Sequence, residues 1–253
     1  MKYCNICSFL VCSVLLLFGG TKTIAQNDKL MTKNGDLTIF PMNHATLALE
    51  WKSEVIYFDP SGSTNLFDRV PKPTLILITD IHGDHLNVNT LESMKFQDVK
   101  IIAPQAVVDK LPSSFSNVTS LGNSNDLDIN GLNIKAIPMY NLPETSDSRH
   151  PKGRGNGYIV TIGGKRIYIS GDTEDIEEMR SLKKIDVAFV CMNLPYTMDV
   201  DAAASAVLDF KPKIVYPFHY RGEGGFSDVD KFKSLVESGN KSIEVRLRNW
   251  YSK

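Results

Sequence analysis

The segment TDIHGDH places two carboxylates and two imidazoles within six positions. Asp80 and His82 alternate, so at the end of an extended strand their side chains point to the same side. The turn that Gly83 allows then brings Asp84 and His85 back toward them. Groups of this kind, placed so close together, would repel one another and lose hydration without a cation between them. The sequence therefore predicts a metal site, and imidazole with carboxylate suits Zn²⁺, with Mn²⁺ or Fe²⁺ as alternatives.

Three further residues of metal-ligand type stand where strands are expected to end. Asp172 follows a strand in YISGDTED, His150 lies in a long loop, and His219 closes the strand in YPFHY. Loops at one edge of layered sheets can converge without disturbing the core, so we expect these residues to meet the first cluster. Taken alone, Asp172 could equally be the N-cap of a helix, and the two histidines could be ordinary core or surface residues.

The elements that must position these residues alternate in two similar halves. Apolar runs predict strands over residues 36–42, 45–51, 54–60, 74–80 and 99–105, a hairpin over 157–172, and strands near 185–193, 213–220 and 242–247. Helices are expected over residues 87–96, capped by Asn87 or Asn89, and over 173–182, 200–210 and 228–238. Two such halves pack most simply as an α/β protein with a four-layer αββα sandwich. No low-complexity linker separates them, so residues 26–253 are expected to form one domain.

The order of these motifs resembles the metallo-β-lactamase superfamily, and within it the branch of lactonase-like and phospholipase-D-like metal-dependent hydrolases. The matching segments are MNHATLALE, VIYFDP, TDIHGDH, RHPKGRGNGYIV, YISGDTED and YPFHY. The family pattern is His-x-His-x-Asp-His, a third His before a hairpin, an Asp in a Gly-Asp-Thr turn, and a final His. This resemblance implies the αββα fold of that superfamily.

The resemblance also implies two divalent ions and assigns their ligands. A shared water of lowered pKa would be the nucleophile, and Asp84 would orient it and relay a proton as the catalytic carboxylate. His44 and Asp59 would orient ligands by hydrogen bonds. The implied metal ligands are Asp80, His82, His150 and Asp172 for one ion, and Asp84, His85 and His219, with Asp172 as the bridge, for the other.

Asp80 departs from the family pattern, because it stands where the first histidine is usual. An anionic ligand in place of a neutral one should favour a harder ion or weaken that metal position. It would also leave the bound water less acidic than an imidazole ligand would. The alternative is that Asp80 only supports another ligand and that the site holds a single ion.

The resemblance does not choose the bond that is cleaved. A lactone or other cyclic ester is one candidate substrate, and a phosphodiester or phospholipid is another. Arg154, in the long loop, could hold a phosphate or carboxylate group. The rival interpretation is a non-catalytic secreted metal-binding protein with a degenerate site. The residues expected to line the pocket, besides Arg154, are Tyr140, Asn193, Tyr196 and Tyr220.

Composition limits the partners of the chain, and its first residues predict export. The 28 Lys and Arg residues nearly balance 29 Asp and Glu residues, so no general attraction to nucleic acid is expected and a small-molecule substrate is favoured. A lysine, an apolar run over residues 9–18 and a small-residue exit predict a signal peptide, residues 1–25, cleaved before Gln26. That run is short for a membrane span, so we expect a periplasmic or secreted protein with no stable membrane insertion after cleavage. The sequence does not reveal the oligomeric state.

Overall fold

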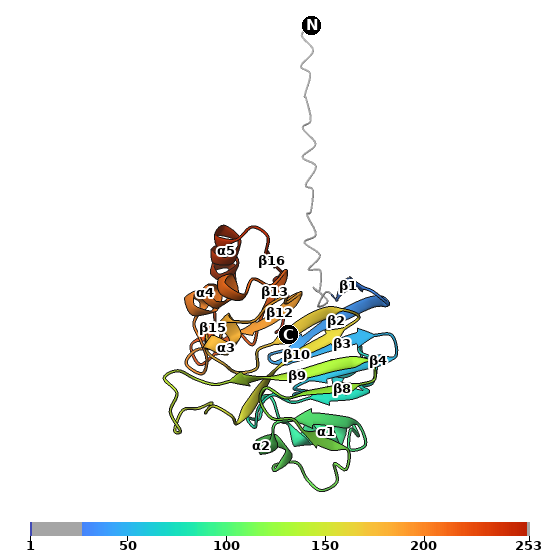
Figure 1. Ribbon diagram of the computed structural model, residues 1–253. Helices are drawn as coiled ribbons and strands as arrows, with labels where there is room; N and C mark the ends of the chain where they lie inside the picture. Colours follow the sequence, from blue (N-terminus) through green and yellow to red (C-terminus); the bar gives the residue numbers. More distant parts are fainter. Residues whose placement is uncertain (2–26, 252–253) are drawn as a thin grey trace.

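Two seven-stranded sheets face each other in the computed structural model, which describes Met1 and residues 27–251 (Figure 1). The predicted signal peptide, beyond Met1, lies outside the described residues. The first sheet runs in chain order: β1 (Asp28–Thr32), β2 (Gly35–Asn43), β3 (Thr46–Trp51), β4 (Glu54–Phe58), β5 (Leu75–Leu77), β6 (Lys100–Ala103) and β7 (Val118–Ser120). The second has the order β16 (Glu244–Val245), β13 (Ile214–Phe218), β12 (Val187–Cys191), β11 (Lys165–Ile169), β10 (Gly155–Ile162), β9 (Leu132–Met139) and β8 (Asp126–Ile129).

Helices cover the outer faces of both sheets. The 3-10 helix η1 (Thr64–Phe67) and the helices α1 (Val88–Ser93) and α2 (Gln105–Val108) pack on the first sheet. The helices α3 (Glu177–Arg180), α4 (Val200–Phe210) and α5 (Val229–Gly239) pack on the second (Figure 1). A small hairpin, β14 (Arg221–Gly222) with β15 (Gly225–Phe226), follows β13. The predicted four-layer αββα sandwich is confirmed.

Alternation along the strands of the first sheet builds two apolar layers. In β2, Leu37 and Ile39 belong to the core between the sheets, whereas Phe40 and Met42 belong to the core under α1 and α2. The same division occurs in β3, β4 and β5, because successive side chains of a strand point to opposite faces. A strand buried on both faces must therefore be apolar throughout, as LIL in β5 is.

Two elements differ from the prediction, and the first of them bears on the site. The helix expected over residues 173–182 is confined to α3, whose N-cap is Ile176, so Asp172 does not cap it. Strand β1, which was not predicted, pairs antiparallel with β2. The cap of α1 is confirmed at Asn87, whose Oδ1 accepts from the Thr90 amide at 3.0 Å.

Parallel strands bring the chemistry-bearing loops to one edge of the sandwich. Strands β4, β5 and β6 are parallel in the first sheet, and β11, β12 and β13 are parallel in the second. Their carboxyl ends lie at the same edge, and the loops that leave there can converge. The loops after β5, β11 and β13 carry TDIHGDH, Asp172 and His219.

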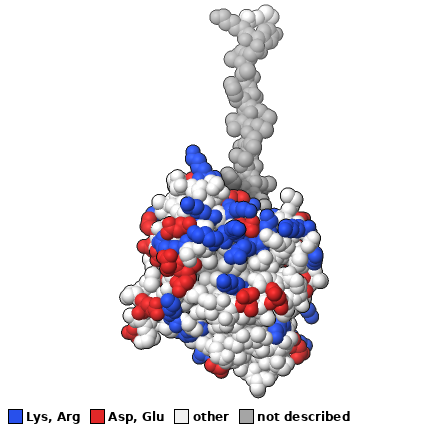
Figure 2. All heavy atoms as spheres, in the orientation of Figure 1, with Lys and Arg blue, Asp and Glu red and all other residues white. Residues whose placement is uncertain are grey.

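The surface of this fold gives no sign of a strongly charged binding face in the view shown. Figure 2 shows Lys and Arg side chains interspersed with Asp and Glu on that face, in keeping with the net charge of −1. No helix among the described residues has both the length and the apolar character needed to cross a membrane.

Candidate metal centre

One group of ligand atoms gathers beside the end of β5. Asp80 Oδ2 lies 2.5 Å from His82 Nδ1 and 4.0 Å from His150 Nε2. Asp80 and His150 are buried, and His82 is partly exposed. The loop after β9 supplies His150, so this group joins the two sheets. These three side chains could hold one metal ion.

A second group forms around two buried imidazoles. The Nε2 atoms of His85 and His219 are 3.2 Å apart. Asp84 offers Oδ2 at 3.4 Å from His219 Nε2 and Oδ1 at 3.9 Å from His85 Nε2. Tetrahedral sites for Zn²⁺ are built from imidazole nitrogens and carboxylate oxygens of this kind.

Asp172 lies between the two groups and contacts both. Its Oδ2 is 3.3 Å from His150 Nε2 and 3.2 Å from His85 Nε2, and its Oδ1 is 3.2 Å from His219 Nε2. The Gly171 backbone has a φ of 61°, and a Cβ there would lie 3.0 Å from the Asn156 carbonyl oxygen. Glycine is therefore required for the turn that aims Asp172 into the centre.

The donor set fits a cation better than it fits a hydrogen-bond network. Buried His150 Nε2 and Asp172 Oδ1 make no hydrogen bond with the described residues, and neither does His82 Nδ1, despite its close approach to Asp80. Buried polar atoms without partners are costly, and here they converge on common points. A divalent ion at each point would satisfy them.

The carboxylates of the centre stay ionised despite their burial. Burial alone would raise the pKa of Asp172, but the neighbouring imidazoles of His219 and His85 outweigh this effect and hold the pKa well below its usual range. Burial likewise opposes ionisation of Asp80, yet the neighbouring imidazoles and Arg154 lower its pKa to about 2. Asp172 and Asp80 are thus buried in their ionised form, which suits both carboxylates to bind a cation.

The opposite balance holds at His85. Burial would lower its pKa, but the carboxylates of Asp172 and Asp59 raise it well above the usual value. Positive charge is therefore favoured at this imidazole. A divalent ion at Nε2 would supply that charge with the imidazole neutral, as a metal ligand must be.

Hydrogen bonds behind the imidazoles set their orientation. Asp59 Oδ2 lies 2.8 Å from His85 Nδ1, and the same carboxylate accepts from the amide and hydroxyl of Thr79 at 2.7 and 2.6 Å. Asn141 Oδ1 lies 3.0 Å from His150 Nδ1 and accepts from the His150 amide at 2.8 Å. Both arrangements turn Nε2 toward the centre.

Thr79 and Asn141 were missed in the sequence. Neither is charged, and Asn141 lies nine residues from the histidine that it orients. Their positions beside strand ends were the available signal, since Thr79 directly precedes Asp80 and Asn141 follows the end of β9.

His44 contacts the second group from the outside. Its Nε2 is 3.3 Å from Asp84 Oδ2, its ring centroid is 3.8 Å from that of His219, and its Nδ1 is 2.8 Å from the Tyr251 hydroxyl. Its distance to Asp84 suits an orienting role, although His44, Asp84 and His219 are close enough together to hold an ion. Tyr251 is a further residue that the sequence gave no reason to select.

The predicted pocket residues are only partly available to a substrate. Tyr140 is buried and donates to Glu178 at 2.8 Å, and Asn193 is buried and accepts from the Thr197 hydroxyl at 2.6 Å. Tyr220 is half-buried and donates to the Arg248 carbonyl at 3.3 Å, while Tyr196 is half-buried beneath the Arg149 guanidinium. Their roles toward a substrate remain predictions.

Arg154 lies on Asp80 rather than in an open pocket. Its Nε and Nη2 donate to the two carboxylate oxygens, each at 3.2 Å. The sequence placed both residues near the centre but gave no indication that they pair.

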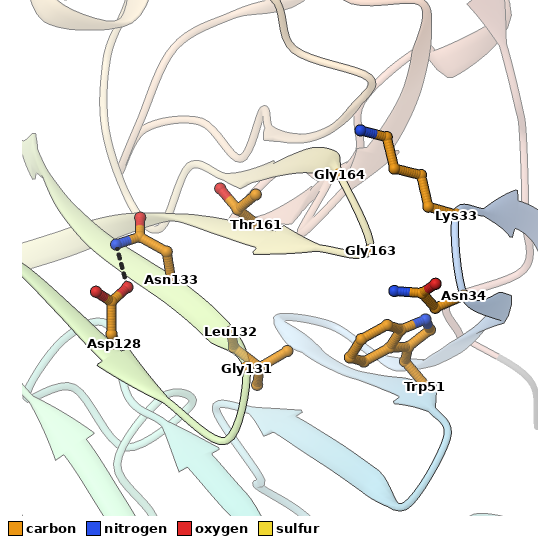
Figure 3. Close-up of a pocket in the computed structure, with 10 residues that line it drawn as sticks. All are labelled: Lys33, Asn34, Trp51, Asp128, Gly131, Leu132, Asn133, Thr161, Gly163 and Gly164. Atoms are coloured by element: carbon orange, nitrogen blue, oxygen red, sulfur yellow. Dashed lines mark hydrogen bonds between the residues drawn. The ribbon is translucent and has the colours of Figure 1, made fainter.

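A separate hollow at the opposite end of the sandwich is lined by hairpin turns (Figure 3). None of its ten lining residues is a histidine or a cysteine. Three of its polar side chains have partners, since Asn133 donates to Asp128 at 2.9 Å and Trp51 Nε1 donates to the Thr32 hydroxyl at 2.9 Å. The candidate chemistry is therefore at the other edge.

Comparison with known proteins gives the same family from sequence and from structure. Residues 38–219 match the family described as the beta-lactamase superfamily domain. A UPF0173 metal-dependent hydrolase from Pyrococcus abyssi is 32% identical over 219 residues, which are 82% of this chain and 94% of that protein. A putative metal-dependent hydrolase from Parabacteroides distasonis, known as a crystal structure, is 38% identical, with a TM-score of 0.78 over 89% of this chain and 99% of that one. A metallo hydrolase from Ignicoccus hospitalis, at 24% identity and a TM-score of 0.71 over 83% of this chain and 94% of that one, shares the fold.

We expect Asp59→Asn to weaken metal binding without unfolding the protein. The change removes the negative charge behind His85 and leaves its Nδ1 without a carboxylate partner, and loss of such a partner costs about 10–100-fold in metal affinity. Zinc affinity is measured by competition with a chelator. The matched control is Asp68→Asn, an exposed position, which should bind zinc like the unaltered protein. Equal affinities for both variants would contradict the role assigned to Asp59.

Proposed function

We propose a reaction for this chain, which belongs to the beta-lactamase superfamily and is a metal-dependent hydrolase. The proposed reaction is the hydrolysis of an ester-type bond, in a lactone or a phosphodiester, with two divalent ions. The observation that carries the proposal is the position of Asp172. Its two oxygens lie within 3.2–3.3 Å of imidazole nitrogens from both groups. A carboxylate placed in this way is suited to bridging a pair of ions.

Ions at these positions, Zn²⁺ by the chemistry of the donors and Mn²⁺ or Fe²⁺ as alternatives, would supply an acidified water as nucleophile and an electrophilic contact for the substrate oxygen. The residues His82 and His150, with Asp80, would hold one ion. The residues His85 and His219, with Asp84, would hold the other.

Asp84 is suited to orient the attacking water. Its side chain is 39% exposed, whereas those of Asp80 and Asp172 are almost fully buried. Burial opposes its ionisation, but hydrogen bonds with His219 and His44 hold its pKa well below the usual range. It is therefore ionised and, unlike Asp80 and Asp172, partly open to solvent. Behind it, His44 and the Tyr251 hydroxyl continue the line of hydrogen-bonding groups.

The single cysteine among the described residues supports water as the nucleophile. Cys191 is fully buried in β12, and its thiol donates to the Thr173 carbonyl oxygen at 3.4 Å. Burial raises its pKa to about 11. A protonated, enclosed thiol cannot attack a substrate.

Three exposed apolar side chains stand in the loop that carries His150, in the loop after β12 and in β15, and they support a substrate with an apolar part. Leu142 follows Asn141, Leu194 lies two residues before Tyr196, and Phe226 packs on the ring of Tyr251. Large apolar side chains left in water near a site commonly mark a binding surface.

The first residues support export of the protein, and residues 1–25 are proposed as its signal peptide. We expect the protein recovered from its native host to begin at Gln26, because Ala25 ends a small-residue exit that follows an apolar run. Sequencing of the amino terminus measures this. Recovery of the protein inside the cell with its first 25 residues attached would contradict export.

We expect Asp84→Asn and His85→Ala to abolish turnover while the fold remains intact. The first replaces the carboxylate that orients the attacking water, and the second removes an ion ligand; each should lower kcat/KM by at least about a hundredfold. The measurement uses a generic lactone, bis-nitrophenyl phosphate and nitrocefin, with circular dichroism to verify folding. The control Asp68→Asn should retain activity. Normal turnover in either site variant would contradict the mechanism, and bound metal without turnover in the unaltered protein would favour a binding function.

We expect Leu194→Ser and Phe226→Ser to raise KM for esters with long apolar chains by about tenfold, since each removes apolar contact worth roughly 1–2 kcal/mol. KM for esters with short chains should change little. The matched control is Met31→Ser, an exposed apolar residue of β1 at the other end of the strands. An equal change for long and short chains would show that these residues do not bind the apolar part of the substrate.

A further inference from the structure

The Arg154 guanidinium binds the Asp80 carboxylate through two hydrogen bonds. Nε donates to Oδ1 and Nη2 to Oδ2, both at 3.2 Å, and Nη2 also donates to the Arg149 carbonyl oxygen at 2.6 Å. Asp80 is fully buried, and the Arg154 side chain is 20% exposed. A two-point contact fixes the plane of a carboxylate as well as its position, which a single ammonium group cannot do.

Backbone contacts between neighbouring residues keep Asp80 and Arg154 close to each other. The Asn156 amide donates to the Thr79 carbonyl oxygen at 2.9 Å, so the residues next to Asp80 and next to Gly155 are tied across the two sheets. A Cβ at Gly155 would lie 2.9 Å from the same Thr79 oxygen. Glycine at this position therefore permits the close approach that delivers Arg154 to Asp80.

The contact leaves Asp80 able to face an ion. Its Oδ2, which accepts from Arg154, is the same oxygen that lies 2.5 Å from His82 Nδ1 and 4.0 Å from His150 Nε2. A carboxylate oxygen has two lone pairs, so it can accept from a guanidinium on one side and bind a cation on the other. Arg154 thus orients this oxygen rather than blocking it.

The charges of the pair cancel within the buried cluster. A carboxylate ligand carries one negative charge that an imidazole ligand does not, and the guanidinium, which never loses its proton, supplies one positive charge in direct contact. We propose that Arg154 is a positioning residue and that the Asp80–Arg154 pair acts as one neutral ligand unit beside His82 and His150. This inference rests on the metal site of the proposed function, and it explains how an aspartate serves where the family pattern has a histidine.

The proposal is tested by restoring the histidine with and without the arginine. In Asp80→His, Arg154 loses its carboxylate partner and becomes an unpaired cation next to the ion. The zinc affinity of the position beside His82 and His150 should therefore fall by at least about tenfold. In Asp80→His with Arg154→Leu, affinity should return to within about threefold of the unaltered protein. Zinc affinity is measured by chelator competition, and zinc content by elemental analysis, neither of which depends on turnover.

A charge-matched control is Asp80→His with Lys152→Gln. Lys152 lies in the same loop but contacts Glu144 and Glu178, so its loss removes the same charge without freeing the imidazole from Arg154. This variant should bind zinc as weakly as Asp80→His. Should Asp80→His fail to fold by circular dichroism, Asp80→Asn takes its place, and its zinc affinity should rise when Arg154→Leu is added, because the uncompensated guanidinium charge is then removed.

Equal zinc affinity in Asp80→His with and without Arg154→Leu would overturn the proposal. The proposal would also be overturned if Lys152→Gln restored the zinc affinity of Asp80→His as strongly as Arg154→Leu does. That result would reveal a general effect of loop charge. An unaltered protein that binds no zinc would refute the pair and the metal site together. Zinc binding that follows the expected order, in a protein that hydrolyses no ester, would uphold the pair and refute only the proposed reaction.

Discussion

Buried negative charge at one edge of the sandwich is the constraint on which the rest of the structure depends. Asp80 and Asp172 are enclosed together, and buried atoms of the cluster such as His150 Nε2 and Asp172 Oδ1 make no hydrogen bond with the described residues. Such a cluster is costly in an apolar interior unless positive charge enters it. The guanidinium of Arg154 supplies part of this positive charge, and divalent ions would supply the rest.

The fold meets this constraint by keeping the polar residues of the site outside the apolar core. Apolar strands such as β5 and β12 fill the layers along their whole length, and the polar residues begin only where the strands end. Because parallel strands of both sheets end at one edge, residues far apart in the chain meet there without a polar group entering the core. Asp80 and Arg154, 74 residues apart, are an example.

Periodicity and motif spacing predicted the layers and the residues that converge, because these depend on short-range pattern and on where strands end. They did not predict what each side chain would contact. The helix expected over residues 173–182 begins instead at Glu177, since the turn through Gly171 directs Asp172 inward. The pairing of Arg154 with Asp80, and of Asn141 with His150, depends on the crossing of loops from different strands, which no local pattern records.

The central claim is that Asp172 joins two ion positions built from these side chains. Anomalous diffraction at the zinc edge, from crystals of the protein grown with zinc, tests it most directly. The account predicts two peaks roughly 3.5–4 Å apart, one beside His82 and His150 and one beside His85 and His219, with Asp172 in contact with both. A single peak with Asp172 bound to one side only, or no peak at the centre, would contradict it.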